Sequence, residues 1–291
     1  MENIIRNIFP FLEKRLPGLA RSIALKAFLK PPRMKILDDD KAFMNAAGER
    51  VVEIRGTKVR YYEWGNYSEY VLLVHGWGGR ASQFKPMVSA LLKAGFNVVA
   101  FDASGHGLST GNESTIFHFS QAIFKCIEKH GLPKAIVGHS LGAVASLLAN
   151  TNGAHCEKLI LCSAPVILEE VLNEFRFKLN ASTRVDEWLK YHSVSKYHME
   201  LANVEGIRIA QRCDKNQKVL IVHDRYDKAV GIENAYSLMK ELPQADTLLT
   251  KELGHNGLIR NEKVIGQIID YIKGLPIKQE NKSETRNLAL N

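Results

Sequence analysis

One five-residue turn constrains the folding of this chain more than any other feature: Gly138-His139-Ser140-Leu141-Gly142. It follows the apolar run Ala135–Val137 and opens an apolar helical stretch over 141–148. In such a strand, turn and helix, the pattern Gly-x-Ser-x-Gly is typical of a nucleophilic serine on a strained backbone. The flanking glycines fit this interpretation, because a Cβ atom at either position would crowd the turn. We therefore expect Ser140 to be a catalytic nucleophile.

Strand and helix patterns alternate along the rest of the chain. A hairpin pattern at 51–62 precedes six apolar runs, at Tyr70–His75, Asn97–Asp102, Lys134–Val137, Lys158–Cys162, Lys218–His223 and Thr247–Leu249. Helical patterns lie between them, at Ser82–Ala94, Phe117–His130, Leu141–Thr151, Ile232–Leu242 and Glu262–Lys273. Strands that are apolar throughout are typical of a sheet covered by helices on both faces. The sequence predicts an α/β fold, a mostly parallel, doubly wound sheet of about eight strands with an antiparallel start.

The alternation is interrupted once, and this gap sets the predicted domain boundaries. Residues 166–217 have a mixed helical pattern without a clear strand and carry eight basic and eight acidic side chains. We expect a small helical cap there, over the carboxyl ends of the strands, inserted between two halves of the core at 50–165 and 218–273. Residues 1–49 form a separate N-terminal segment. The polar stretch 274–291 is expected to be a disordered tail.

The net charge of +8 is concentrated at the two ends of the chain. Residues 1–35 carry +6, residues 273–291 carry +2, and the body between them is neutral. This distribution argues against nucleic-acid binding, which needs a basic patch on the folded body. The basic end is also apolar and is expected to form short amphipathic helices interrupted at Pro10 and Pro17. We favour their packing on the main domain, with peripheral contact to an anionic membrane as the alternative.

Composition also limits the setting in which the protein works. No run of 18 apolar residues and no secretion signal is evident, so we expect a cytoplasmic protein, with membrane association left open. The cysteines lack paired spacing and are expected to be buried free thiols: Cys126, Cys156, Cys162 and Cys213. No His or Asp cluster has the spacing of metal ligands, so no metal is expected. The oligomeric state is not indicated.

A serine hydroxyl needs a base to accept its proton and a third group to orient that base. His255 follows the last predicted strand, and Asp227 follows the strand before it. The order Ser140, Asp227, His255 is that expected of a nucleophile-elbow enzyme. Since all three follow carboxyl ends of parallel strands, the sheet brings them together. Asp224 is a rival acid, although we prefer Asp227.

Negative charge on the substrate carbonyl also needs two donors in an oxyanion hole. We expect one donor to be the backbone N–H of Leu141, directly after the nucleophile. The other is expected from the glycine-rich segment His75–Gly79, at the N–H of Trp77. The candidate substrate-binding side chains are Trp77, His139, Phe175 and Trp188, although the last two, in the cap, suit simple packing equally well.

Over residues 50–273 the chain resembles the α/β-hydrolase fold family. The resemblance rests on the turn at 138–142, the segment His75–Gly79, the two acid and base positions, and Asp102–Ser109, which is similar to the family's Asp-x-x-Gly-His-Gly-x-Ser loop. The sequence departs from the family at Asp224, where glycine is usual, and at Ser104, where proline is frequent. In the loop, Asp102 and His106 are expected to be structural, as are His75 and His223.

The resemblance implies a cofactor-free serine hydrolase that forms an acyl-enzyme. We expect its substrate to be a small-molecule carboxylic ester or thioester with a small to medium apolar acyl group. A serine at the elbow argues against haloalkane dehalogenases and epoxide hydrolases, which use an aspartate nucleophile. A C–C bond hydrolase, a membrane-surface lipid acyl hydrolase and a slow-turnover small-molecule receptor of the same fold remain as alternatives.

Overall fold

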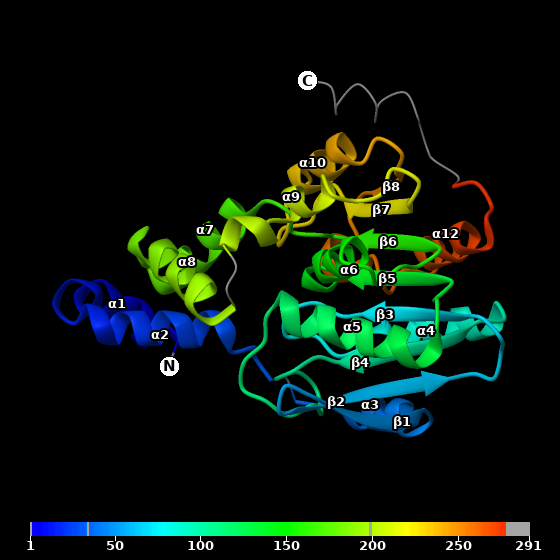
Figure 1. The fold of residues 1–291 in the computed structure, drawn as a ribbon, viewed down its shortest axis with the longest axis horizontal. Helices are drawn as coiled ribbons and strands as arrows, with labels where there is room; N and C mark the ends of the chain where they lie inside the picture. The colour runs from blue at the N-terminus through cyan, green and yellow to red at the C-terminus, as the bar shows by residue number, and fades with distance from the viewer. Residues whose placement is uncertain (1, 34, 198–199, 278–291) are drawn as a thin grey trace.

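A single sheet organises the larger part of the molecule in a computed structural model that describes residues 2–33, 35–197 and 200–277 (Figure 1). Its eight strands have the order β1-β2-β4-β3-β5-β6-β7-β8. In chain order they are β1 (Gly48–Ile54), β2 (Thr57–Trp64), β3 (Tyr70–Val74), β4 (Asn97–Asp102), β5 (Ala135–His139), β6 (Lys158–Cys162), β7 (Lys218–Asp224) and β8 (Asp246–Thr250).

The strand directions confirm the predicted architecture. β1 and β2 form the antiparallel start, and β2 is also antiparallel to β4. The strands from β4 across to β8 pair in parallel throughout. The carboxyl ends of β5, β7 and β8 therefore lie at one edge of the sheet, and the turns that follow them carry Ser140, Asp227 and His255.

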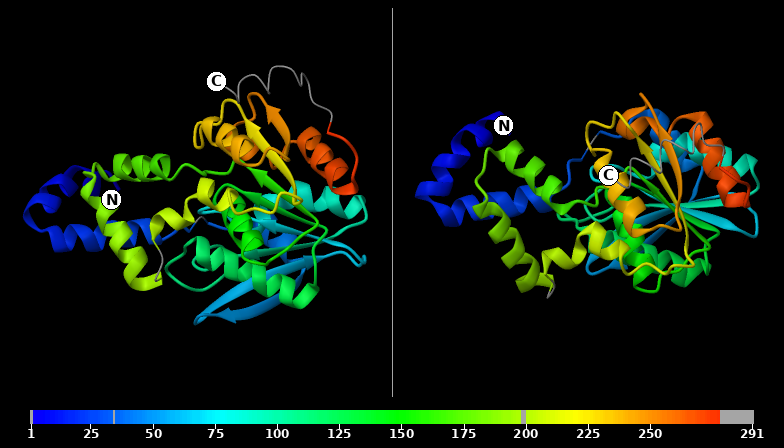
Figure 2. Two further views of the ribbon diagram at one scale, coloured as in Figure 1. Left: turned by 45° about the horizontal axis from the view of Figure 1, so that its top comes forward. Right: turned by 90° about the horizontal axis from the view of Figure 1, so that it is seen from above.

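Helices cover both faces of the sheet, which explains why the central strands β3, β5 and β6 are buried at every position (Figure 2). On β3, Leu72 and Val74 pack into one buried cluster, whereas Val71 and Leu73 pack into another on the opposite face. The first face is covered by α5 (Ile116–His130), α6 (Leu141–Thr151), α9 (Gly206–Ala210) and α10 (Glu233–Glu241). The second is covered by α3 (Asp38–Asn45), the 3-10 helix η1 (Ala81–Phe84), α4 (Lys85–Lys93) and α12 (Glu262–Lys273).

A second, smaller body of helices projects from one end of the sheet (Figures 1 and 2). It contains α1 (Glu2–Arg15) and α2 (Pro17–Leu29), together with α7 (Leu168–Leu179) and α8 (Arg184–Tyr197). We call these four helices the lobe. Its small core joins the two pairs through these buried residues: Phe9, Ala20, Ala24, Leu172, Leu179, Val185 and Leu189.

The lobe corrects two expectations about the N-terminal segment. The prediction that these helices pack on the main domain is wrong. Their apolar faces pack on α7 and α8 instead. The predicted interruption at Pro10 is also wrong, because α1 continues through Pro10 to Arg15. Packing of Phe9 and Leu12 on the lobe, to either side of the proline, offsets the hydrogen bond that proline cannot donate.

Residues 166–217, the expected cap, contain α7, α8, the 3-10 helix η2 (Leu201–Val204) and α9, and no strand in their described part. The short helix α11 (Gly254–Gly257) follows β8. The expected tail over 274–291 lies outside the described residues from 278 onward. None of the helices in the described residues is long and apolar enough to cross a membrane. The four cysteines are buried free thiols, as predicted.

Candidate active site

The turn after β5 holds Ser140 in a conformation that few residues other than glycine adopt. Ser140 has φ 54° and ψ −126°, and its N–H donates to the carbonyl of Cys162 on β6 at 2.9 Å. The turn also brings α6 against the sheet, where a Cβ atom on Gly142 would lie 2.3 Å from the carbonyl oxygens of Val74 and His75. The strained backbone projects the serine side chain away from the sheet at the amino end of α6.

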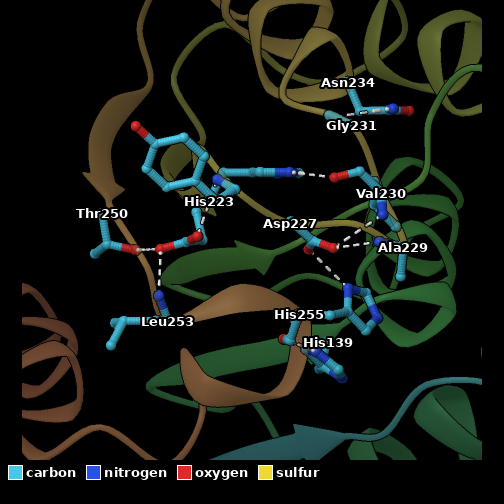
Figure 3. A network of polar contacts seen from close by, with 12 residues as sticks. His139, His223, Asp227, Ala229, Val230, Gly231, Asn234, Thr250, Leu253 and His255 are labelled. Atoms are coloured by element: carbon cyan, nitrogen blue, oxygen red, sulfur yellow. Dashed lines mark hydrogen bonds and ion pairs between the residues drawn. The ribbon is translucent and has the colours of Figure 1, made fainter.

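His255 and Asp227 are in direct contact (Figure 3). The Nδ1 atom of His255 lies 2.8 Å from Oδ2 of Asp227. The other carboxylate oxygen accepts hydrogen bonds from the N–H groups of Ala229 at 2.8 Å and Val230 at 2.9 Å. The Asp227 side chain is fully buried, while that of His255 retains 19% of its exposure. The carboxylate is thus fixed on one side by backbone and on the other by the imidazole.

The pKa of Asp227 follows from these contacts. Burial alone raises the pKa of a carboxyl group, but here the hydrogen bonds from His255 and the two N–H groups outweigh it and hold the pKa at about 2. Asp227 is therefore ionised across the physiological pH range. An ionised carboxylate at Nδ1 orients the imidazole with Nε2 free to accept a proton.

Asp224, the rival acid, has different partners. Its Oδ2 atom accepts hydrogen bonds from Thr250 Oγ1 at 2.7 Å and from the N–H of Leu253 at 3.0 Å (Figure 3). Its Oδ1 accepts from the N–H of Tyr226. The Asp224 carboxylate thus ties β7 to the loop after β8 and has no contact with His255. Of the two acids, Asp227 alone contacts the histidine.

The Ser140 turn and His255 meet through His139. The Nε2 atom of His139 lies 3.0 Å from the backbone carbonyl of His255, and the two ring centroids are 4.7 Å apart. Burial lowers the pKa of His139 to about 4, with a smaller contribution from the charge of His255. His139 is therefore neutral, and its Nε2–H donates to the His255 carbonyl. Within the described chain, Ser140 and His255 share no hydrogen bond, as is frequent in catalytic sites without substrate.

Two backbone N–H groups beside Ser140 are available for a ligand. Leu141 occupies the first position of α6, where a helical N–H has no intrahelical carbonyl. In the described residues the N–H of Trp77 also lacks a partner. The loop carrying Trp77 is close to the nucleophile, because a Cβ atom on Gly76 would lie 3.3 Å from Ser140 Oγ. The Trp77 side chain is 37% exposed.

The remaining motif residues hold loops in place, as predicted. Asp102 accepts hydrogen bonds from the N–H groups of Ala81 and Leu108, and burial raises its pKa despite them. His75 accepts from the N–H of Ala103 at 3.0 Å, and burial keeps its pKa well below the usual range. Burial also lowers the pKa of His106 to about 4. These groups fix the loops after β3 and β4.

The structure does not gather all four candidate substrate-binding side chains beside Ser140. Phe175 and Trp188 pack within the lobe, where Phe175 meets the ring of Phe28 on α2 at 4.9 Å. His139 is buried against His255. Trp77 follows Gly76, which lies close to Ser140, and its ring lies 5.4 Å from that of His106. The hydrogen bond from His139 to the backbone carbonyl of His255 could not be predicted from the sequence. A motif shows which residues are neighbours in the chain and gives no information on contacts with distant residues.

Comparisons with known proteins concern the family and the fold of the chain. The family model for serine aminopeptidases of type S33 matches residues 65–251. The chain is 32% identical over 115 residues to a bifunctional esterase/perhydrolase of Acinetobacter calcoaceticus, covering 38% of this chain and 42% of the relative. It is 33% identical over 108 residues to a dihydrolipoyllysine-residue acetyltransferase component of an acetoin-cleaving system from Cupriavidus necator, covering 36% and 29% respectively. The chain thus spans less than half the length of these curated relatives.

Solved structures share the fold at low sequence identity. An esterase of Pyrococcus furiosus superposes with a TM-score of 0.63 and 18% identity, over 84% of this chain and 97% of that one. A thioesterase domain from the curacin biosynthetic pathway superposes with a TM-score of 0.58 and 19% identity, over 79% and 100%. At these identities the structural likeness establishes the architecture of the chain and leaves its substrate open.

Proposed function

Since this chain belongs to the α/β-hydrolase family, with a match to the S33 serine aminopeptidase model over most of its core, we propose that it is a serine hydrolase. Its proposed substrate is a carboxylic ester or thioester with a small to medium apolar acyl group. The observation that carries the proposal is the Asp227–His255 contact at 2.8 Å, on the same edge of the sheet as the strained turn of Ser140.

The proposed reaction gives each group one role. Ser140 Oγ attacks the substrate carbonyl while His255 Nε2 takes its proton, and Asp227 stabilises the imidazolium that forms. The N–H groups of Trp77 and Leu141 stabilise the tetrahedral oxyanion. His255 returns the proton to the leaving alcohol or thiol, which leaves an acyl group on Ser140. Water, deprotonated by His255, then releases the acid and restores the serine.

The proposed substrate class has two supports. The names of an esterase/perhydrolase relative and of an esterase and a thioesterase with the same fold all indicate acyl transfer from oxygen or sulfur. The side chains of the two oxyanion donors, Trp77 and Leu141, are apolar.

The buried free thiols support the expectation of a reducing, cytoplasmic setting.

The test is steady-state hydrolysis of p-nitrophenyl esters from acetate to palmitate, beside acyl-coenzyme A thioesters and aminoacyl anilides. We expect turnover of esters or thioesters that disappears in Ser140→Ala, with the preferred chain length reporting the size of the acyl pocket. Preferred cleavage of the anilides would instead favour a peptidase, in line with the description of the matching family model. Tight ligand binding without repeated turnover would favour a receptor of the same fold.

A further inference from the structure

The outer end of the lobe exposes apolar side chains that its core does not need. It is formed by the turn between α1 and α2, which lies farthest from the sheet in all three views (Figures 1 and 2). Four large apolar residues retain between 45% and 63% of their exposure along α1, at this turn and at the start of α2: Ile8, Phe11, Leu16 and Leu19. We call them the tip residues. Ile8 and Phe11 are three positions apart and lie on one face of α1, whereas Leu16 is the residue before α2 and Leu19 lies in the first turn of α2.

The tip residues are separate from the lobe's packing surface. On α1, Phe9 is fully buried against α7 and α8, and the neighbouring Phe11 is 63% exposed. Glu13 is also buried, with its carboxylate accepting hydrogen bonds from the N–H and hydroxyl of Ser182. The lobe therefore has its own core, and the tip residues form an additional apolar surface that faces away from it.

The charge around the tip residues is basic. Lys14 and Arg15 are exposed at the end of α1, and Arg184 lies beside them, with its guanidinium 3.4 Å from the carbonyl of Glu13. Two of the nearby carboxylates are engaged, since Glu13 is held by Ser182 and Asp186 is paired with Arg176, while Glu187 is exposed further along α8. An apolar patch bordered by cations is complementary to a layer of anionic headgroups over hydrocarbon, and less so to another protein surface.

We propose that the outer end of the lobe binds the surface of an anionic phospholipid membrane. The tip residues enter the boundary between headgroups and acyl chains, and Lys14, Arg15 and Arg184 contact lipid phosphates. Both α1 and α2 are too short to cross the bilayer, so the proposed binding is at its surface. The proposal concerns binding alone and stands whether or not the site beside Ser140 hydrolyses esters.

The chain that leaves α2 connects this surface to the candidate active site. Pro31 and Pro32 pack against Gly105 and Gly78, so closely that a Cβ atom on either glycine would lie 2.9 Å from a proline ring. The loop of Gly78 is the one that carries the Trp77 N–H. A lobe bound at a membrane therefore holds the candidate active site at a fixed distance from the lipid.

The test is cosedimentation of the full chain with phosphatidylcholine vesicles, with and without phosphatidylglycerol. We expect binding that requires the anionic lipid and weakens with salt. Lys14→Gln/Arg15→Gln should weaken binding by about fivefold per charge, from about 1 kcal/mol per basic group near such a surface. Phe11→Ser/Leu16→Ser should weaken it by about tenfold or more, because the inserted apolar area is lost.

Matched controls come from the core surface. Leu132→Ser removes a comparably exposed apolar side chain (58%) and Lys93→Gln an exposed cation, both far from the lobe, and neither should change binding. Circular dichroism and ester turnover should be unchanged in all variants, since the altered side chains are exposed. Absent binding, or equal binding of the tip and control variants, would overturn the proposal. Self-association that depends on Phe11 and Leu16 without vesicle binding would overturn it too, and would show pairing of two copies.

Discussion

The core and the lobe solve the problem of burying apolar surface in different ways. The core covers both faces of its sheet, so that every position of β3, β5 and β6 is buried. The lobe buries one side of each helix and leaves large apolar residues exposed on the other. Strand pairing fixes the backbone that positions the candidate catalytic residues, whereas helices with one free face can present a surface to a partner.

The sharpest test of the core's role is Ser140→Ala. It removes the nucleophile while keeping the turn, so we expect kcat to fall by about a thousandfold or more. Ser163→Ala is the matched control, because Ser163 also has a positive φ (48°) directly after the neighbouring strand β6 and is fully buried. It should leave kcat within about twofold. Equal losses would mean that the strained turn, and not the Ser140 hydroxyl, supports activity.

The second test separates two acids within the core. Asp227→Asn should lower kcat by about a thousandfold, because the imidazole loses the carboxylate that orients it. Asp224→Asn should lower kcat by less than about tenfold, and should instead reduce stability by about 1 to 3 kcal/mol through its bonds to Thr250 and Leu253. Kinetics and urea unfolding measure both effects. The reverse ranking in kcat would assign the catalytic acid to Asp224.

A third prediction asks whether lobe and core unfold independently. Phe9→Ala should destabilise the lobe by about 3 kcal/mol through a cavity, and speed amide exchange in α1, α2, α7 and α8 by about a hundredfold. Amide exchange in β5 and β6 should be unaffected. Phe11→Ala, on the exposed face of the same helix, is the control and should have an effect below about 0.5 kcal/mol. Faster exchange in β5 and β6 would show that the two bodies unfold together.

The last test is the pH dependence of core stability. Burial holds the pKa of His106 and His139 at about 4, below the ordinary value of 6.5, so the unfolded chain binds protons first as the pH falls. The free energy of unfolding should be greatest above about pH 6.5 and decline towards pH 4, where Asp227 is still ionised. His139→Gln keeps a donor that cannot titrate and should flatten this decline in urea unfolding. An unchanged slope would contradict a buried neutral His139.

The sequence predicted the core well because the signals were local. Each useful signal lies within a few positions of the sequence: the apolar strands, the Gly138–Gly142 turn and the residues after β7 and β8. The parallel sheet then places the residues that follow its strands at one edge. The observed strands differ from the expected ones by a few residues at their ends, as β1 does by starting at Gly48.

The lobe was predicted less well because its structure depends on contacts between distant segments. The pattern of α1 indicated an apolar face without indicating which surface covers it, and α7 and α8 are about 160 residues away. Phe175 and Trp188 showed the same limit, since aromatic side chains suit a pocket and a helical core equally. Pro10 was expected to end a helix, and only the packing on both sides of it explains why it does not.

The two prolines after α2 have a mechanical consequence. Proline fixes φ, so Pro31-Pro32 forms a short, rigid connection and not a flexible linker. Directly after the prolines, the Arg33 guanidinium donates hydrogen bonds to the carbonyls of Ser109 and Gly111. The α1–α2 pair is therefore joined to the loops around Gly78 and Gly105 by a short segment whose backbone has little freedom to bend.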